Sequence, residues 1–187
     1  VYGGTHRVAT RILANHGFEF DFVDTRFLPK VESSIKPNTK WIFAETPTNP
    51  LLEICNIEAL SGLSKSKNVK LAIDNTFMSP YGQSPITLGA DVVMHSATKF
   101  IGGHSDLIAG VLITSDLAVA NDLYFIQKSG GAVLSPFDSW MLLRSTKTLA
   151  LRFQRHSDNA MAIARILNDF SKVKSVIYPG LQSHSQH

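Results

Sequence analysis

The sequence contains a single cysteine, Cys55, among 187 residues. One thiol cannot form an internal disulfide, a CxxC redox pair or a zinc knuckle, so these sites are excluded within the chain. Its simplest interpretation is a buried apolar side chain. Long apolar runs are also missing, because none approaches the roughly 20 residues that cross a bilayer and no signal-peptide pattern is present. We therefore expect a cytoplasmic protein that does not contact a membrane.

The chain also has only a small excess of positive over negative charge. The formal net charge is +3, and the basic residues are scattered apart from the short group Lys65, Lys67 and Lys70. A nucleic-acid-binding surface needs a stronger basic patch, so nucleic acid is not expected as a partner. The patterns GxGxxG, GxxxxGKS and GxxxxGKT do not occur, which counts against an NAD- or ATP-dependent enzyme.

Several possible metal ligands lie in the middle of the chain, namely His95, His104, Asp106 and Asp91. No pair of them has the i, i+4 helical spacing of an HExxH motif. We therefore expect no metal site, and a metal-dependent hydrolase is the remoter alternative function.

The overall composition is that of an ordinary globular protein. Hydrophobic residues make up 44% of the chain and charged residues 18%, which is enough apolar material to bury a core. The chain begins at Val1 without a methionine and ends shortly after a turn at residues 178–180. We expect it to be a fragment of a longer protein.

Short apolar runs alternate with amphipathic stretches, which predicts an α/β fold with a mainly parallel sheet and helices on both faces. Apolar residues keep a helical spacing from Phe137 to Leu167, which predicts one long helix leaving the sheet. The predicted strands are residues 18–23, 41–44, 69–73, 91–94, 110–113 and 173–177, and the other predicted helices are 5–15, 57–66 and 116–127. These patterns predict three parts, a large domain at 1–136, a bridging helix at 137–170 and the start of a second domain at 171–187.

Chemically active side chains follow two of the predicted strands. Asp74 comes directly after residues 69–73, while residues 91–94 run into Ser96, Thr98 and Lys99. Ligands of open α/β sheets bind at the carboxyl ends of the strands. A carboxylate, an amine and two hydroxyls are what pyridoxal 5'-phosphate (PLP) needs for its ring nitrogen, its aldehyde and its phosphate. Two interpretations stay open. These residues can form a PLP site, or they can be a turn-forming Asp and a solvated Lys, because a strand-end Asp is often a turn former and a loop Lys is usually solvated.

Longer motifs surround these residues. They are residues 2–5 (YGGT), 45–50 (ETPTNP), 74–77 (DNTF), 88–91 (LGAD), 96–106 (SATKFIGGHSD), 147–149 (KTL) and 178–181 (YPGL). In this order, and over essentially the whole chain, they resemble the PLP-dependent enzymes of cysteine and methionine metabolism. The resemblance implies fold type I, in which residues 1–136 form an aspartate-aminotransferase-like large domain that lacks its N-terminal part.

The same resemblance implies roles for four residues near the strand ends. Lys99 matches the lysine that carries PLP as a Schiff base and also moves protons. Asp74 matches the partner of the pyridine nitrogen, and Ser96 and Thr98 match phosphate ligands. The plainer alternatives are a surface amine, a helix cap and two hydroxyls that cap local backbone.

Two further residues are assigned in the same way. Tyr2 matches a tyrosine whose ring stacks on the cofactor and whose hydroxyl helps to activate the leaving group, with ordinary aromatic packing as the alternative. Asn49 matches a residue near the phenolic oxygen of PLP. Glu45 lies in the same motif, and a structural carboxylate at a strand end is an equally good interpretation of it.

The implied activity is trans-sulfuration of a small amino-acid substrate. Residues 2–5 lack the cysteine of methionine γ-lyases and residues 74–77 lack the tryptophan of cystathionine β-lyases. Similarities at 75–81 and 178–184 favour cystathionine γ-lyase, which releases an oxoacid and ammonia. Cystathionine γ-synthase, acting on an O-acyl-homoserine, and an inactive PLP-binding fragment are the alternatives. The resemblance also implies a homotetramer built from active dimers. The sequence departs from the family pattern at residues 128–130 and 145–146, which lie away from the cofactor positions.

Overall fold

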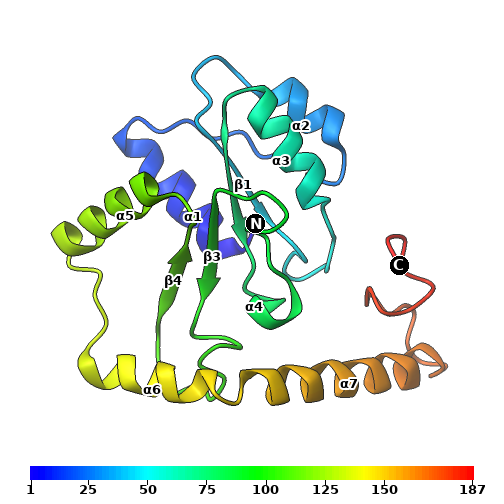
Figure 1. Ribbon diagram of the computed structural model, residues 1–187. Coiled ribbons are helices and arrows are strands. Elements are labelled where there is room, and N and C mark those ends of the chain that lie inside the picture. Colours follow the sequence, from blue (N-terminus) through cyan, green and yellow to red (C-terminus); the bar gives the residue numbers. More distant parts are fainter.

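A four-stranded sheet forms the centre of the computed structural model, which describes all of residues 1–187. Three neighbouring strands are parallel, and the fourth pairs antiparallel with the third. In spatial order the strands are β1 (Trp41–Glu45), β2 (Lys70–Asp74), β3 (Val92–Ser96) and β4 (Gly110–Ile113) (Figure 1). The predicted α/β fold with a mainly parallel sheet is confirmed.

The main apolar core lies between the sheet and the helices α2 (Leu28–Ser34) and α3 (Ile57–Ser66). β2 is buried along most of its length, as expected of a strand between two parallel neighbours. Leu60 of α3 and Ile73 of β2 are almost completely buried in this cluster. Cys55 belongs to the same cluster, so its predicted burial is confirmed. This packing fixes β2 and therefore the residues at its carboxyl end.

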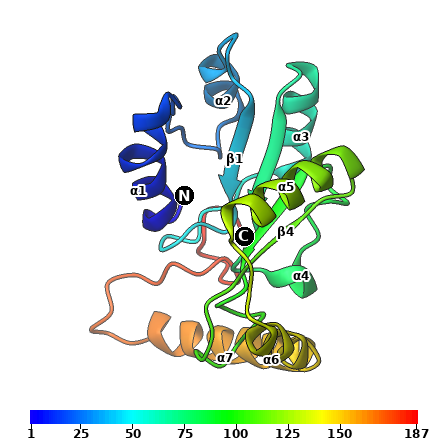
Figure 2. The ribbon, with the colours of Figure 1, turned by 90° about the vertical axis from the view of Figure 1, so that its left-hand side faces the viewer.

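Helices lie on both sides of the sheet, as predicted. α1 (Gly3–Arg11), followed by the 3-10 helix η1 (Leu13–His16), lies on the side opposite to α3 (Figure 2). α5 (Leu117–Gly130) follows β4 and is capped by Asp116, whose carboxylate accepts a hydrogen bond from the Ala118 N–H (2.9 Å). The predicted helix at 57–66 coincides with α3, whereas the predicted helix at 5–15 is divided into α1 and η1.

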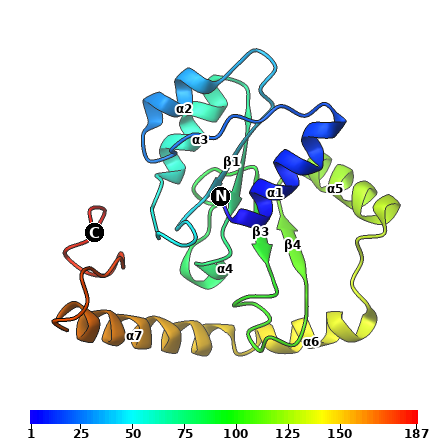
Figure 3. The ribbon, with the colours of Figure 1, turned by 180° about the vertical axis from the view of Figure 1, so that it is seen from behind.

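Two consecutive helices, α6 (Pro136–Thr146) and α7 (Leu149–Asn168), cross below the carboxyl ends of the parallel strands (Figures 1 and 3). The prediction of a single helix is wrong at Thr148, whose backbone leaves the helical conformation (φ −106°, ψ 3°). The Arg152 guanidinium donates hydrogen bonds to the Ser145 carbonyl (2.9 Å) and the Thr148 hydroxyl (3.0 Å). The break is therefore stabilised by a side chain of α7 itself.

Two predicted strands are wrong. Residues 18–23 have the alternating pattern of a strand, yet their backbone forms no ladder with another strand, and the same holds for residues 173–177. A strand needs a hydrogen-bonded neighbour, and the side-chain pattern alone does not supply one. Phe18, Phe20 and Phe22 are accordingly exposed.

Two short helices, α2 and α4 (Ser79–Gly82), were not predicted. Both carry proline in the first turn, where its fixed φ angle suits a helix start, but the same residue is easily interpreted as a turn. None of the helices is both long enough and apolar enough to cross a membrane.

Candidate functional site

The carboxyl ends of β2 and β3 carry two of the predicted cofactor-binding residues, Asp74 and Ser96. Asp74 is only 5% exposed, and its carboxylate accepts a hydrogen bond from the Thr76 N–H (3.0 Å). The Thr76 hydroxyl accepts a hydrogen bond from the Ser96 N–H (2.8 Å), so Thr76 joins the two strand ends. Asp74 forms no ion pair within the chain. A buried carboxylate without a cation is costly, so a positively charged ligand group would be stabilised here.

Lys99 lies in the tight loop that follows β3. Its backbone N–H donates to the Ser96 carbonyl (3.0 Å), and the Gly102 N–H donates to the Ala97 carbonyl (2.7 Å). The Lys99 side chain is exposed, and its amine forms no ion pair with the protein. A free amine on a fixed loop is what covalent attachment of an aldehyde requires.

The hydroxyl of Thr98 is bound to the local backbone. It accepts a hydrogen bond from the Ala109 N–H (2.9 Å) and donates to the Ala109 carbonyl (3.2 Å). This is the plainer of the two interpretations of Thr98, namely a hydroxyl that holds the Lys99 loop against the start of β4. To bind a phosphate, the Thr98 hydroxyl has to release the Ala109 carbonyl.

Arg152 of α7 holds the far end of the Lys99 loop. Its guanidinium donates hydrogen bonds to the carbonyls of Phe100 (2.6 Å) and Ile101 (3.2 Å). Burial lowers the pKa of this guanidinium. Gly103, at φ +74°, lies so close that a Cβ there would collide with the Arg152 guanidinium. The loop that carries Lys99 is therefore attached to a helix as well as to the sheet.

The backbone N–H groups of Asn49 and Tyr2 both lie near Glu45 at the carboxyl end of β1. Glu45, the last residue of β1, is the register partner of Asp74 and accepts a hydrogen bond from the Asn49 N–H (3.1 Å). Burial, together with the negative charge of Asp74, raises the pKa of Glu45, while the amino group of Val1 and the N–H groups of Asn49 and Tyr2 act in the opposite direction. Tyr2 directly precedes α1, and its side chain is 49% exposed. Three predicted site residues, Asn49, Tyr2 and Asp74, thus lie near the buried carboxyl group of Glu45.

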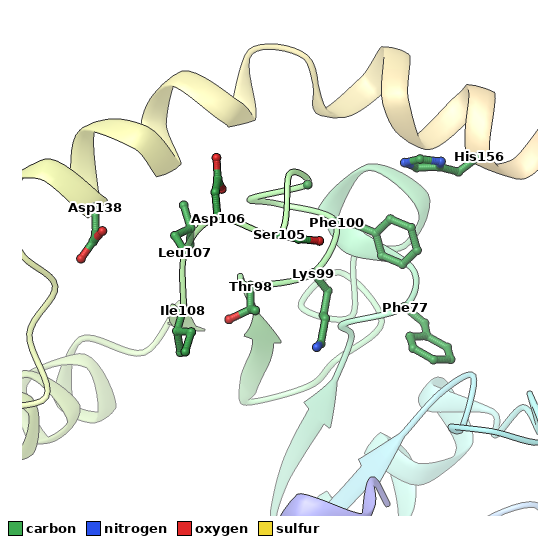
Figure 4. A pocket seen from close by; sticks show the side chains of 11 residues that line it. Phe77, Thr98, Lys99, Phe100, Ser105, Asp106, Leu107, Ile108, Asp138 and His156 are labelled. Atoms are coloured by element: carbon green, nitrogen blue, oxygen red, sulfur yellow. The ribbon is translucent and has the colours of Figure 1, made fainter.

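An open cavity of about 860 Å³ adjoins the Lys99 loop. Thr98, Lys99 and Phe77 line it from the sheet side, and Asp138 of α6 and His156 of α7 line it from the helices. Figure 4 shows the Lys99 side chain extending from its loop toward the segment that carries Phe77. The lining does not include the other predicted site residues, Tyr2, Asn49, Asp74 and Ser96. Of the predicted site residues, the cavity therefore reaches only Thr98 and Lys99, and its volume is large enough for a small ligand.

His95 is the most buried titratable residue of β3, at 1% exposed. Burial lowers its pKa, and its Nδ1 atom has no hydrogen-bond partner. A neutral imidazole is therefore favoured at this position. No group of three or more His, Cys, Asp or Glu side chains is arranged to hold a metal ion.

Two residues of the site were missed from the sequence. Thr76 follows Asp74 by two positions, and its hydroxyl could have been recognised as a possible link between strand ends. Arg152 gives no comparable signal, because it is 52 positions from the Phe100 carbonyl that it binds. Only the fold brings α7 to the Lys99 loop.

The residues at the strand ends fit PLP. The buried Asp74 carboxylate suits a protonated ring nitrogen, the unpaired Lys99 amine suits an aldehyde, and Ser96 offers a hydroxyl for the phosphate. When bound, PLP supplies an electron-accepting ring that stabilises negative charge on an attached amino acid.

The mainly parallel α/β fold, which is shared with solved cystathionine lyase and synthase structures, is that of the PLP-dependent enzymes of fold type I. The sequence model of the family described as Cys/Met metabolism PLP-dependent enzyme matches residues 1–187. The chain belongs to this family.

Individual relatives carry several enzyme names. The chain is 49% identical to a probable cystathionine gamma-synthase of Herpetosiphon aurantiacus, covering 100% of this chain and 59% of that protein. It is 47% identical to a cystathionine beta-lyase of Lactococcus lactis subsp. cremoris (strain MG1363), and the match covers 100% of this chain and 49% of that protein. A crystal structure of cystathionine gamma-lyase from Lactobacillus plantarum complexed with L-serine matches with TM-score 0.98 and 45% identity, covering 100% and 49%. The chain spans about half the length of these relatives.

Proposed function

We propose that the chain catalyses, within its whole protein, the γ-elimination that cleaves cystathionine, as in cystathionine γ-lyase. The observation that carries this proposal is the position of Asp74 at the end of β2 and of Lys99 in the loop after the neighbouring parallel strand β3, whose last residue, Ser96, is linked to Asp74 through Thr76. A buried carboxylate and a free amine in this arrangement have the charge and reactivity that PLP requires.

Lys99 and Asp74 perform the central chemical roles. The Lys99 amine would hold PLP covalently, and the same amine, when free, would move protons at the substrate α- and β-carbons. The Asp74 carboxylate keeps the ring nitrogen protonated through a charge-assisted hydrogen bond. Its burial strengthens this interaction, because little water competes for the carboxylate.

The remaining site residues bind and orient the cofactor. Ser96 and Thr98 would bind the phosphate of PLP, Asn49 would lie near its phenolic oxygen, and the ring of Tyr2 would stack on it. The Tyr2 hydroxyl helps the γ-substituent to leave. Tyr2 is half exposed at the start of α1, which leaves its ring free to cover a ligand.

Cystathionine γ-synthase is the second candidate. It is favoured by the identity of 49% to a relative of that name. The synthase shares the early steps with the lyase and differs at the last step. The synthase adds the sulfur of cysteine to the substrate, whereas the lyase releases an oxoacid and ammonia. A PLP-binding protein without activity is the third candidate. A fourth reaction, β-elimination, is disfavoured by the absence of tryptophan at residues 74–77.

We also propose that the whole protein is a cytoplasmic homotetramer made of active dimers. Large apolar side chains on the outside of the chain support an assembly, among them Phe125 (69% exposed) and Leu151 (75% exposed). Within the chain, we propose a PLP-binding domain at 1–136, a bridging region at 137–170 and part of a further domain at 171–187.

Product analysis distinguishes the candidates. The PLP-loaded whole protein is expected to release an oxoacid, ammonia and cysteine from cystathionine, and a Lys99→Ala variant is expected to release none. Formation of cystathionine from cysteine and an O-acyl-homoserine, without oxoacid release, would identify the synthase. Release of homocysteine would identify β-elimination. The absence of any product would favour the inactive PLP-binding protein.

A further inference from the structure

Glu45 has an unusual position for a carboxyl group. It is 7% exposed, and its register partner on the adjacent strand is another buried carboxyl group, Asp74. Side chains of register partners in a parallel sheet point to the same face, and the strands are only about 4.8 Å apart. Two negative charges at this separation, both shielded from water, strongly repel each other.

The two carboxylate oxygens of Glu45 have different surroundings. Oε1 accepts the hydrogen bond from the Asn49 N–H (3.1 Å). Oε2 is buried and accepts no hydrogen bond, although it forms an ion pair with the amino group of Val1 at 3.7 Å and the Tyr2 N–H lies near the carboxyl group. An ionised oxygen without a donor is unfavourable when buried, whereas a protonated oxygen carries its own hydrogen and no charge.

We propose that Glu45 is a positioning residue that remains a neutral acid at neutral pH. In this form it leaves Asp74 as the single negative charge for the cofactor ring and anchors the backbone of Asn49. The inference rests on the proposed PLP function and adds a role that is separate from those of the cofactor-binding residues. The charged side chain that faces Glu45 is Asp74 of β2, and in the chain as given the amino group of Val1 faces it as well.

The protonation state can be tested without the cofactor. Infrared spectra of the PLP-free whole protein at neutral pH are expected to contain a carboxylic-acid C=O band that Glu45→Gln removes. Glu58→Gln, at an exposed position in the first turn of α3, is the matched control and is expected to retain the band. A band that is missing from the parent protein, or that persists in Glu45→Gln, would overturn the proposal.

The positioning role is tested with PLP. Because an amide replaces a neutral acid, Glu45→Gln is expected to keep the pH dependence of the bound-cofactor absorbance and to bind PLP within about threefold of the parent. Glu45→Ala removes the acceptor of the Asn49 N–H and is expected to weaken PLP binding by about tenfold or more. A changed pH dependence in Glu45→Gln, or equal PLP affinity in both variants, would contradict the role. If the parent and Glu58→Gln show no PLP absorbance, the proposed function fails, whereas the infrared result still decides the state of Glu45.

Discussion

At the scale of single residues, the burial of Asp74 has a consequence that can be measured. Asp74→Asn keeps the shape and the Thr76 hydrogen bond but loses the negative charge. We expect PLP to remain bound and kcat to fall about ten- to hundredfold, since a charge-assisted hydrogen bond contributes about 1.5 to 3 kcal/mol.

The measurement is steady-state kinetics combined with absorbance of the bound cofactor. Asp122→Asn, at an exposed position of α5, is the control and is expected to behave like the parent. An unchanged kcat for Asp74→Asn would show that Asp74 is only a turn residue.

The predicted site residues differ in how completely the sequence could place them. The positions of Asp74 at the end of β2 and of Lys99 in the loop after β3 agree with the sequence prediction, because the apolar run of each strand is evident, while their roles stay predictions. The structural interpretation of Thr98 could not be separated from the binding interpretation, since its bond to Ala109 depends on the position of β4. The role of Arg152 depends on long-range packing and left no local pattern.

At the scale of elements, the Lys99 loop depends on its attachment to α7. Arg152→Met preserves much of the apolar stem but removes hydrogen bonds to the Phe100, Ile101 and Ser145 carbonyls. We expect the free energy of unfolding of the whole protein to fall by about 2 to 4 kcal/mol.

Urea denaturation measures this effect. Arg155→Met on the same helix is the matched control, because Arg155 is exposed and forms no ion pair, and its effect is expected to be within about 0.5 kcal/mol. Equal stability of the two variants would mean that the loop is held by the sheet alone.

Sequence periodicity predicted α3 and the strands that pair in the sheet better than the segments that remain unpaired. β2 and α3 were placed almost to the residue, because their apolar faces meet in the same core. Residues 18–23 and 173–177 have strand-like patterns, but pairing is a non-local property that a pattern cannot report. The break at Thr148 could not be predicted from the apolar pattern either, because it is stabilised by a hydrogen bond from Arg152 in the next turn of the helix.

At the scale of the whole molecule, apolar side chains remain on the outside of the chain. Ile108 is 87% exposed, Leu151 of α7 is 75% exposed and Phe125 of α5 is 69% exposed. Residues 1–187 produced alone are therefore expected to self-associate, because exposed apolar surface is unfavourable in water. Sedimentation velocity measures this, and a stable monomer of 20.5 kDa would contradict the expectation.

The central claim is that Lys99 carries PLP, and chemical labelling tests it most directly. Borohydride treatment of the PLP-loaded whole protein fixes the cofactor on the lysine to which it is attached. Digestion and mass spectrometry are then expected to find the label on the peptide that contains Lys99, and to find no label in a Lys99→Ala variant. A label on another lysine, or no label on the loaded protein, would contradict the account.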